Sequence, residues 1–193
     1  MNIGLFGGSF NPIHNGHVSL AKALLREAAL DEVWFMVSPQ NPLKTDQRLL
    51  DDGKRLQLVR AALKGEQHLV ACDFEFGLPK PSYTWNTLEA LKQKFPDHRF
   101  TLLIGGDNWA DFRKWYRYED ILRNYPIVVY PRSGADTVIG DDIPETTDIR
   151  IVNTPLLDIS STMIRERLKR GESIRGLVPE AAASIIGREG LYR

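Results

Sequence analysis

Near its start the chain reads Gly7-Gly8-Ser9-Phe10-Asn11-Pro12-Ile13-His14-Asn15-Gly16-His17, and this stretch decides the fold. It follows a short apolar run at residues 3–6, which predicts a buried β-strand. Gly7 and Gly8 carry no Cβ, so the chain can turn tightly there and bring main-chain N–H groups close to a ligand. The pattern therefore predicts a strand, a glycine-rich turn and a helix, in that order.

A glycine-rich turn that opens into a helix is a natural phosphate site. The first N–H groups of a helix lack partners and carry partial positive charge, so an anion is favoured where Gly16 and His17 begin the helix. His14 and His17 are three residues apart, which places both rings over the same end if the helix starts near Asn15. An imidazole beside polyphosphate tends toward its charged form, which suits it to phosphoryl chemistry.

Other interpretations of these histidines stay open at this point. A Gly-Gly turn after a first strand is common, and a histidine pair at this spacing can be half of a metal site or two surface residues. A catalytic zinc site is disfavoured, because the chain has one cysteine and no His-Glu-x-x-His motif.

The composition limits the class of protein. The 193 residues, 42% hydrophobic, can bury a core, and we expect a single domain over residues 1–193. The 25 basic and 25 acidic side chains balance, which argues against a general nucleic-acid-binding protein. Cys72 is the only cysteine, which excludes an internal disulfide and fits a reducing compartment. We see no long apolar span and no signal-like N-terminus, so we expect no membrane association and a cytoplasmic location.

Strands and helices alternate along the chain. Strands are predicted at residues 3–6, 32–37, 68–72, 100–104, 127–130 and 150–153, and helices at 17–30, 47–63, 84–94, 160–169 and 179–188. We expect the Thr84 hydroxyl to cap the third helix and Pro179 to take the first position of the last one. This alternation predicts an α/β fold with a doubly wound parallel sheet.

Ligands of such sheets bind beyond the carboxyl ends of the strands, where the strand order reverses. Polar motifs follow three predicted strands, at residues 7–17, 39–44 and 105–107. Residues 133–148, rich in glycine, proline, threonine and acidic residues, are predicted to form a loop, and whether it closes over a substrate stays open.

A second chemical cluster lies near the C-terminus and reads Asp158-Ile159-Ser160-Ser161-Thr162-Met163-Ile164-Arg165. A helix cap explains one of its three hydroxyls. Together the hydroxyls, the main-chain N–H groups and the Arg165 guanidinium suit a pair of phosphates. We therefore expect a small C-terminal helical segment, about residues 158–193, to carry a phosphate motif.

Both clusters resemble the signatures of the nucleotidyltransferase superfamily marked by a His-x-Gly-His motif. Residues 14–17, preceded by Gly-Gly-Ser-Phe-Asn-Pro, match the first signature. Residues 159–165 match the Ile-Ser-Ser-Thr-x-Ile-Arg segment that this superfamily uses to hold ATP phosphates. Residues 81–88 and 104–108, with Trp115-Tyr116, look like the bacterial nicotinate-nucleotide adenylyltransferases. The resemblance covers nearly the whole chain and implies a Rossmann-like nucleotidyltransferase fold.

The resemblance implies transfer of the adenylyl group of ATP to nicotinate mononucleotide, with Mg²⁺ bound mainly through the ATP phosphates. The implied ATP site comprises Gly7, Gly8, Ser9, Phe10, His14, His17, Gly105, Asp107, Ile159, Ser160, Ser161, Thr162 and Arg165. The implied nicotinate mononucleotide site comprises Lys44, Thr84, Trp85, Asp107, Trp115, Tyr116 and Arg132. The implied catalytic residues are His14, His17, Lys44 and Arg165.

In that family the tryptophan matching Trp115 stacks on the pyridine ring, and main-chain N–H groups matching Thr84 or Trp85 and Tyr116 receive the carboxylate. The acid matching Asp107 contacts ribose. Trp115 could instead be a core aromatic, although its charged neighbours oppose this. Arg132 is equally well a ligand or a solvated loop charge.

One position departs from the family pattern. The family commonly has a histidine where this chain has Leu43, which removes one contact and leaves ligand detail around this loop in doubt. The neighbouring Lys44 is kept, so the departure does not undermine the transfer chemistry.

No activated nucleophile is required, because the phosphate of the acceptor is already anionic, and the expected mechanism is direct in-line attack. Two alternatives stay open. The acceptor could be nicotinamide mononucleotide or phosphopantetheine, or the chain could be a non-catalytic nucleotide-binding module. The intact pair of histidines, Ser161 and Arg165 oppose the second alternative. The sequence leaves a homo-oligomer open.

Overall fold

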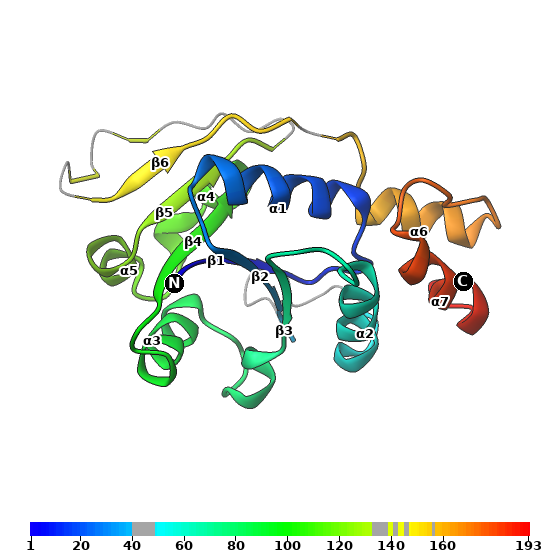
Figure 1. The fold of residues 1–193 in the computed structure, drawn as a ribbon, viewed down its shortest axis with the longest axis horizontal. Helices are drawn as coiled ribbons and strands as arrows, with labels where there is room; N and C mark the ends of the chain where they lie inside the picture. Colours follow the sequence, from blue (N-terminus) through cyan, green and yellow to red (C-terminus); the bar gives the residue numbers. More distant parts are fainter. Residues whose placement is uncertain (40–48, 133–138, 141–142, 145–146, 156) are drawn as a thin grey trace.

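The computed structural model describes residues 1–39, 49–132, 139–140, 143–144, 147–155 and 157–193. Within them a six-stranded sheet forms the centre of the molecule, with strand order β3-β2-β1-β4-β5-β6 (Figure 1). The strands are β1 (Asn2–Gly8), β2 (Glu32–Val37), β3 (Leu69–Cys72), β4 (Arg99–Gly105), β5 (Ile127–Tyr130) and β6 (Ile149–Ile151). Each neighbouring pair is parallel.

The strand order reverses between β1 and β4, which lie side by side with Leu5 opposite Leu102. From β1 the chain winds outward to β2 and β3, then returns to β4 and winds the other way to β5 and β6. The predicted doubly wound parallel sheet is thereby confirmed. The carboxyl ends of β1 and β4 mark the switch point at which such sheets bind ligands.

Helices cover both faces of this sheet. They are α1 (Asn15–Glu27), α2 (Asp52–Ala62), α3 (Thr84–Lys94), α4 (Gly106–Ala110), α5 (Tyr118–Asn124), α6 (Ser161–Lys169) and α7 (Glu180–Glu189), with short 3₁₀ helices at Phe74–Gly77 and Phe112–Lys114. None of the described helices is long and apolar enough to cross a membrane.

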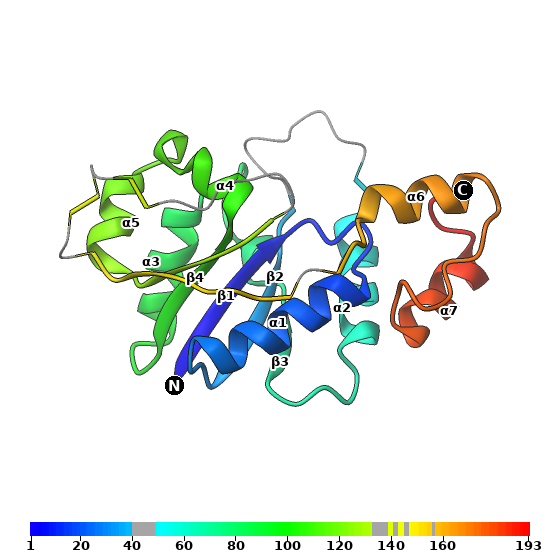
Figure 2. The same cartoon turned by 90° about the horizontal axis from the view of Figure 1, so that it is seen from above.

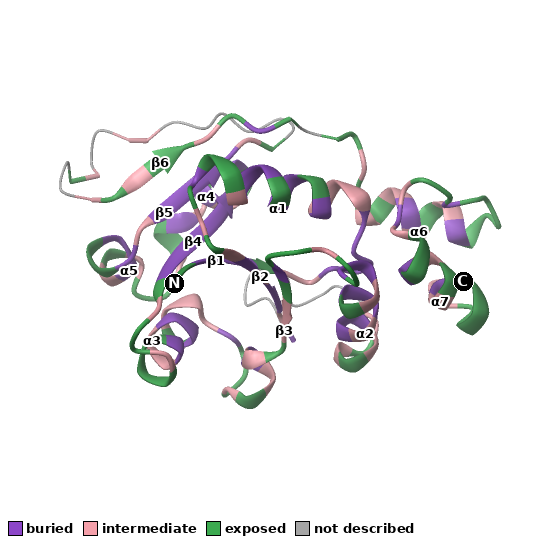
Figure 3. Cartoon of the chain, viewed as in Figure 1, coloured by how far each residue is buried: buried purple, intermediate pink, exposed green. Residues whose placement is uncertain are grey.

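Two hydrophobic clusters lie on opposite faces of the sheet, because successive strand residues point to opposite sides. Phe6 and Leu103 belong to the cluster under α1 and α2, which also contains residues of α6 and α7. Leu5 and Leu102 belong to the cluster under α3 and α5. Figure 3 shows the buried residues gathered along the central strands. The C-terminal helices thus share their core with the N-terminal half of the chain.

All the predicted strands are present, and β2 and β5 have the predicted bounds. The first helix starts at Asn15, two residues earlier than predicted. The second starts at Asp52 rather than residue 47, because the Asp51 carboxylate caps it by accepting a hydrogen bond from the Lys54 N–H at 3.2 Å.

Two predicted helix starts were wrong in their details. Thr84 is the first residue of α3, and its cap is Tyr83, which makes no side-chain capping bond. Pro179 is the cap of α7 rather than its first residue. The short helices α4 and α5 were not predicted, since five and seven residues are too few for a full amphipathic repeat. Most of the loop predicted at 133–148 lies outside the described residues.

Candidate active site

Two cavities meet at the carboxyl end of β1. The larger, of about 430 Å³, is lined by both histidines of the first motif and is named here the histidine cavity. The smaller, of about 170 Å³, is lined by Trp115 and is named the tryptophan cavity. The residues that line both are Gly7, Gly8, Ser9, Asn108 and Tyr130. The glycine-rich turn therefore forms the border between two differently built spaces.

The histidine cavity brings together segments from both ends of the chain. All the residues predicted to bind ATP line it except Gly105, which lines the tryptophan cavity. Figure 2 shows why: the starts of α1 and α6 both lie beyond the carboxyl end of β1. The first and last motifs, about 145 residues apart in sequence, thus face the same space.

His14 and His17 stack at the beginning of α1. Their ring centroids are 3.6 Å apart, and the ring planes are inclined by 27°. The main-chain N–H of His14 donates a hydrogen bond to His17 Nδ1 at 3.2 Å. Because Nδ1 accepts this bond, the neutral His17 ring carries its proton on Nε2. His17 is therefore a fixed donor at the helix start.

Burial determines the charge of both rings. Burial, together with the smaller effect of the nearby Arg132 guanidinium, lowers the pKa of His14 from 6.5 to about 4. Burial also lowers the pKa of His17 well below its usual value, helped by His14 and Arg132. The ring of His17 packs edge-on against that of Phe10, with centroids 5.1 Å apart. The rings are thus neutral at pH 7 in the free protein, because burial disfavours their charged form. The charged form predicted beside polyphosphate concerns the ATP-bound chain and stays a prediction.

Gly16 makes this arrangement of rings fit. A Cβ at position 16 would lie 2.9 Å from His14 Nδ1 and 3.0 Å from its Cε1. That Nδ1 atom is buried and has no hydrogen-bond partner among the described residues. A side chain at this second position between the histidines would displace the His14 ring.

The hydroxyls at the start of α6 have separate tasks. Ser160 Oγ caps the helix by accepting a hydrogen bond from the Met163 N–H at 3.1 Å. Ser161 Oγ donates to the Pro12 carbonyl at 2.8 Å, which ties α6 to the turn after β1. The cap that the sequence predicted for one hydroxyl is confirmed. The next hydroxyl joins the two motifs to each other.

Arg165 strengthens the same link. Its Nη1 donates to the Asn11 carbonyl at 2.8 Å, and its Nη2 donates to Thr162 Oγ1 at 3.3 Å. The side chain also lines the histidine cavity. A guanidinium has five N–H donors, so donors remain for a ligand after these two bonds. Arg165 therefore combines a structural bond with a cation at the cavity wall.

Asp107 and Arg132 form an ion pair beyond the ends of β4 and β5, with Nε and Oδ1 3.7 Å apart. A Cβ at Gly105 would lie 2.7 Å from Asp107 Oδ1 and 2.9 Å from Arg132 Cγ, so this glycine makes room for the pair. Both charged side chains line the histidine cavity, not the tryptophan cavity. The structure thus separates Arg132 from the aromatic residues with which the sequence grouped it.

The tryptophan cavity has an aromatic rim. Trp115, Tyr116, Tyr83 and Thr84 line it, as does Lys114. The rings of Tyr83 and Tyr116 lie 5.0 Å apart, and Tyr116 is half exposed. Trp115 Nε1 is buried without a hydrogen-bond partner among the described residues. A flat ring with a polar substituent suits such a space.

The side chain of one predicted site residue, Trp85, lines neither cavity. It packs against Tyr125, and the Arg117 guanidinium lies 4.6 Å from the centre of its ring. The prediction for Trp85 concerned its main-chain N–H, which the start of α3 holds beside Thr84. Lys44 and Leu43 lie outside the described residues.

Comparisons with known proteins agree with this geometry. The cytidylyltransferase-like family model matches residues 5–167. A probable nicotinate-nucleotide adenylyltransferase of Flavobacterium psychrophilum is 44% identical, and the match covers 100% of both chains. One of Bacteroides thetaiotaomicron is 47% identical over 91% of this chain and 85% of that protein. The chain belongs to the nicotinate-nucleotide adenylyltransferase family.

Solved structures of similar proteins share the fold. A putative nicotinate-nucleotide adenylyltransferase from Vibrio parahaemolyticus is 26% identical, with a TM-score of 0.74 over 100% of this chain and 95% of that one. The nicotinic acid mononucleotide adenylyltransferase of Plasmodium falciparum, complexed with NaAD, has a TM-score of 0.80 over 99% of this chain and 97% of its own, at 20% identity. The Rossmann-like nucleotidyltransferase fold implied by the resemblance is confirmed.

Sequence reasoning missed two buried charged residues near the site of this adenylyltransferase family member. Glu75 lines the tryptophan cavity, where burial raises its pKa and its Oε1 accepts a hydrogen bond from Thr87 Oγ1 at 2.7 Å. Arg55 lies on the inner face of α2 and is fully buried. The second had a signal in the sequence, because Arg55, Leu58, Val59 and Ala62 follow the i, i+3, i+4, i+7 spacing of a buried helix face.

No group of three or more His, Cys, Asp or Glu side chains in the described part of the chain is arranged to hold a metal ion.

Proposed function

We propose that this chain transfers the adenylyl group of ATP to nicotinate mononucleotide and releases deamido-NAD and pyrophosphate. The observation that carries the proposal is the pair of cavities that share the turn at Gly7, Gly8 and Ser9. The histidine cavity offers cationic and helix-terminal groups, which suit a triphosphate. The tryptophan cavity offers an indole face, which suits a flat pyridine ring. Two substrates bound in this way place their phosphates together at the shared turn.

The reaction is a single displacement at phosphorus. An oxygen of the acceptor's 5′-phosphate forms a bond to the α-phosphorus of ATP. The bond from that phosphorus to the oxygen bridging to the β-phosphate breaks, and the electron pair leaves with pyrophosphate. No protein nucleophile takes part, because the acceptor phosphate is already anionic. The protein contributes orientation and charge.

His17 and His14 stabilise the phosphates of ATP. The fixed Nε2–H of His17 points a donor at the transferring α-phosphate, and His14 contacts the phosphates beside it. Both neutral rings can take up a proton as the polyphosphate brings negative charge next to them. The interaction is strong because the rings are held in a partly dry site before ATP arrives.

Arg165 and Lys44 stabilise the departing pyrophosphate. The unpaired N–H groups at the start of α6 assist them, since Ser160 and Ser161 hold that helix end against the turn after β1. Mg²⁺ would be held mainly by the phosphates of ATP, where it would offset part of their negative charge. In this arrangement the last motif of the chain binds the leaving group and the first binds the group that is transferred.

The acceptor binds in the tryptophan cavity. Its positively charged pyridine ring stacks on Trp115, an attraction of roughly 0.5 to 2 kcal/mol. Main-chain N–H groups of Thr84 or Trp85 and of Tyr116 receive the carboxylate, and donors without a neighbouring acceptor select a carboxylate over an amide. Asp107 contacts ribose. Arg132, which pairs with Asp107 at the mouth of the histidine cavity, contacts the acceptor from its phosphate side.

A panel of acceptors tests the proposal. The purified chain is incubated with ATP and Mg²⁺, and pyrophosphate release is measured with nicotinate mononucleotide, nicotinamide mononucleotide and phosphopantetheine in parallel. We expect clear preference for the nicotinate acceptor. Release with a different acceptor alone would overturn the assignment of the tryptophan cavity. ATP binding without release in any arm would identify a nucleotide-binding module instead.

A further inference from the structure

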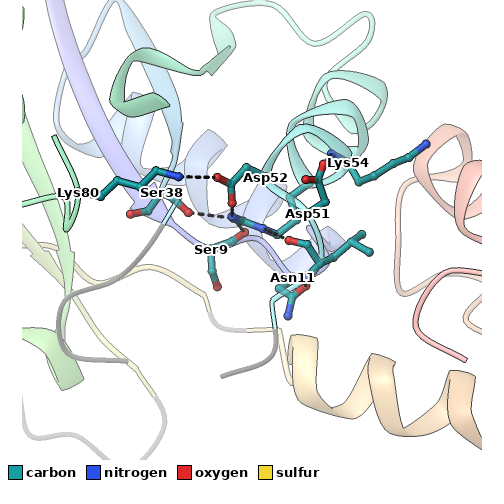
Figure 4. A network of polar contacts seen from close by, with 9 residues as sticks. Ser9, Asn11, Ser38, Asp51, Asp52, Lys54 and Lys80 are labelled. Carbon is teal, nitrogen blue, oxygen red and sulfur yellow. Dashed lines mark hydrogen bonds and ion pairs between the residues drawn. The ribbon is translucent and has the colours of Figure 1, made fainter. Parts of the chain in front are cut away.

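Arg55 is a fully buried cation that makes four hydrogen bonds to protein acceptors. Its Nη1 donates hydrogen bonds to the Ser9 carbonyl at 2.5 Å and to the Ser38 carbonyl at 3.0 Å. Its Nε donates to the Leu50 carbonyl at 2.9 Å, and its Nη2 pairs with Asp52 Oδ1 at 2.6 Å. A buried guanidinium is tolerated only when its donors are satisfied in this way. Figure 4 shows three of these partners, Ser9, Ser38 and Asp52, close together although they come from separate segments.

These partners come from the segments that border both cavities. Ser9 lies in the turn where the two cavities meet, and Ser38 follows β2 and lines the tryptophan cavity. The Ser38 N–H also donates to the Gly8 carbonyl at 3.0 Å. One side chain of α2 thus fixes the ends of β1 and β2 relative to each other. Arg55 itself lines neither cavity.

The hydrogen bond from Arg55 to the Ser9 carbonyl also determines where the Phe10 N–H points. The peptide between Ser9 and Phe10 is trans and planar, so its carbonyl and its N–H point in opposite directions. Because Arg55 holds the carbonyl, the Phe10 N–H is turned away from Arg55. Phe10 lines the histidine cavity. Its φ of 45° lies in the left-handed region, which a phenylalanine rarely adopts and which needs support from its surroundings.

The turn is held from its other side by the last motif. Leu50 N–H donates to Asn11 Oδ1 at 3.2 Å, while the Asn11 carbonyl accepts a hydrogen bond from Arg165. Arg165 lines the histidine cavity and can touch a phosphate, whereas the buried Arg55 cannot. Both arginines therefore hold the same turn by hydrogen bonds, but only Arg165 also faces the histidine cavity.

We infer that Arg55 is a positioning residue: by holding the Ser9 carbonyl it aims the Phe10 N–H at a phosphate where the two cavities meet. The inference rests on the proposed function, since the phosphate is that of its substrates. Leu50 and Asp52 lie at the start of α2, so the bonds to them stay within that segment. The bonds to Ser9 and Ser38 reach the turns after β1 and β2 and fix the Ser9 carbonyl there.

The direct test is the amide resonance of Phe10 in ¹H–¹⁵N spectra of the full chain, recorded with and without ATP and Mg²⁺. In the wild-type chain we expect the Phe10 amide proton to move downfield on adding ATP. In Arg55→Lys, which keeps the charge but loses the guanidinium fork, we expect that movement to be lost. The amides of Gly16 and His17 should still respond to ATP in the same variant.

Kinetics supply the second readout. Arg55→Lys should lower kcat by roughly 10- to 100-fold, with smaller changes in both KM values, because a misdirected donor costs more in the transition state than in binding. Lys54→Met is the matched control on the same helix, since Lys54 is exposed and pairs with Glu189, and it should leave kcat unchanged. Asp52→Asn is a milder variant that keeps the bonds to both carbonyls, and it should lose less of kcat than Arg55→Lys.

Two results would overturn the inference. One is a Phe10 amide that does not respond to ATP in the wild-type chain. The other is an Arg55→Lys variant whose melting temperature falls while the Phe10 response and kcat per folded molecule are kept. If Arg55→Lys does not fold, Asp52→Asn and the wild-type spectrum decide. A wild-type chain that releases no pyrophosphate would refute the proposed function, and the Phe10 response would still decide the role of Arg55.

Discussion

The rings of His14 and His17 are stacked 3.6 Å apart at the first turn of α1, with Gly16 between them in sequence leaving space for the His14 ring. Two neutral imidazoles can lie this close, whereas two imidazolium rings in a buried site would repel each other. In the proposed reaction the arriving phosphates would supply the negative charge that relieves this repulsion. The proposal therefore predicts that phosphate binding is coupled to proton uptake by the stacked pair.

Removing the His17 ring should abolish most of the turnover. His17→Ala deletes the donor that faces the α-phosphate, and a charged or polar contact of this kind is worth about 10²- to 10³-fold in rate. We expect kcat to fall by that factor while the melting curve stays cooperative. His68→Asn is the control, because His68 is exposed and its positive φ suits asparagine. A His17→Ala chain with near wild-type kcat would remove His17 from the mechanism.

The free energy of unfolding should depend on pH through the buried rings. The pKa of folded His14 is about 4, below its value of 6.5 in the unfolded chain. Between these values the unfolded chain binds a proton that the folded chain does not, so stability falls as pH falls from 6.5 toward 4. Each such histidine contributes a slope of at most about 1.4 kcal/mol per pH unit. Urea unfolding of the free protein between pH 5 and 7 measures the slope.

The variant His14→Asn should reduce this slope. The opposite trend, greater stability at lower pH over this range, would show that the rings are charged in the free protein.

Gly16 should matter for turnover and not for folding. Alanine is a better helix former than glycine by roughly 0.5 to 1 kcal/mol, but its Cβ would lie against the His14 ring at 2.9 Å. We expect Gly16→Ala to fold normally and to lower kcat/KM for ATP by about 10-fold, since the displaced ring misses the phosphates. Gly187→Ala in α7 meets no atom within 4 Å and should gain stability without losing activity. Equal activity of the two variants would contradict the role given to Gly16.

Replacing Trp115 should change the KM of one substrate only. Trp115→Leu removes the stacking face, and loss of roughly 0.5 to 2 kcal/mol corresponds to a rise of about 2- to 30-fold in KM for nicotinate mononucleotide. The KM for ATP should stay the same, because the indole lines only the tryptophan cavity. Trp34→Phe is the control at a position that lines neither cavity. A rise in the KM for ATP would place Trp115 elsewhere in the reaction.

The sequence predicted those parts of the site whose chemistry stands in consecutive residues. The turn after β1 and the hydroxyl cluster at the start of α6 each predict a helix start with anion-binding groups. The structure places both in the lining of one cavity. The doubly wound sheet followed from alternating apolar runs in the same way. In each case the signal lies within about ten residues of the feature it predicts.

What the sequence could not predict depends on contacts between distant segments. The role inferred for Arg55 depends on its hydrogen bonds to Ser9 and Ser38, which are 46 and 17 residues away in the sequence. The protonation of the two histidines depends on burial and on the charge of Arg132, which spacing cannot report. Arg132 was grouped with the aromatic residues on the resemblance alone, whereas the structure places it in the lining of the histidine cavity.

The central claim is that the phosphates of two bound substrates meet at the shared turn and react directly. Its most direct test is the stereochemical course at the α-phosphorus, measured with one diastereomer of ATPαS as the donor and nicotinate mononucleotide as the acceptor. A single in-line displacement predicts inversion of configuration in the deamido-NAD analogue that is formed. Retention would require two displacements through a covalent enzyme intermediate and would contradict the account.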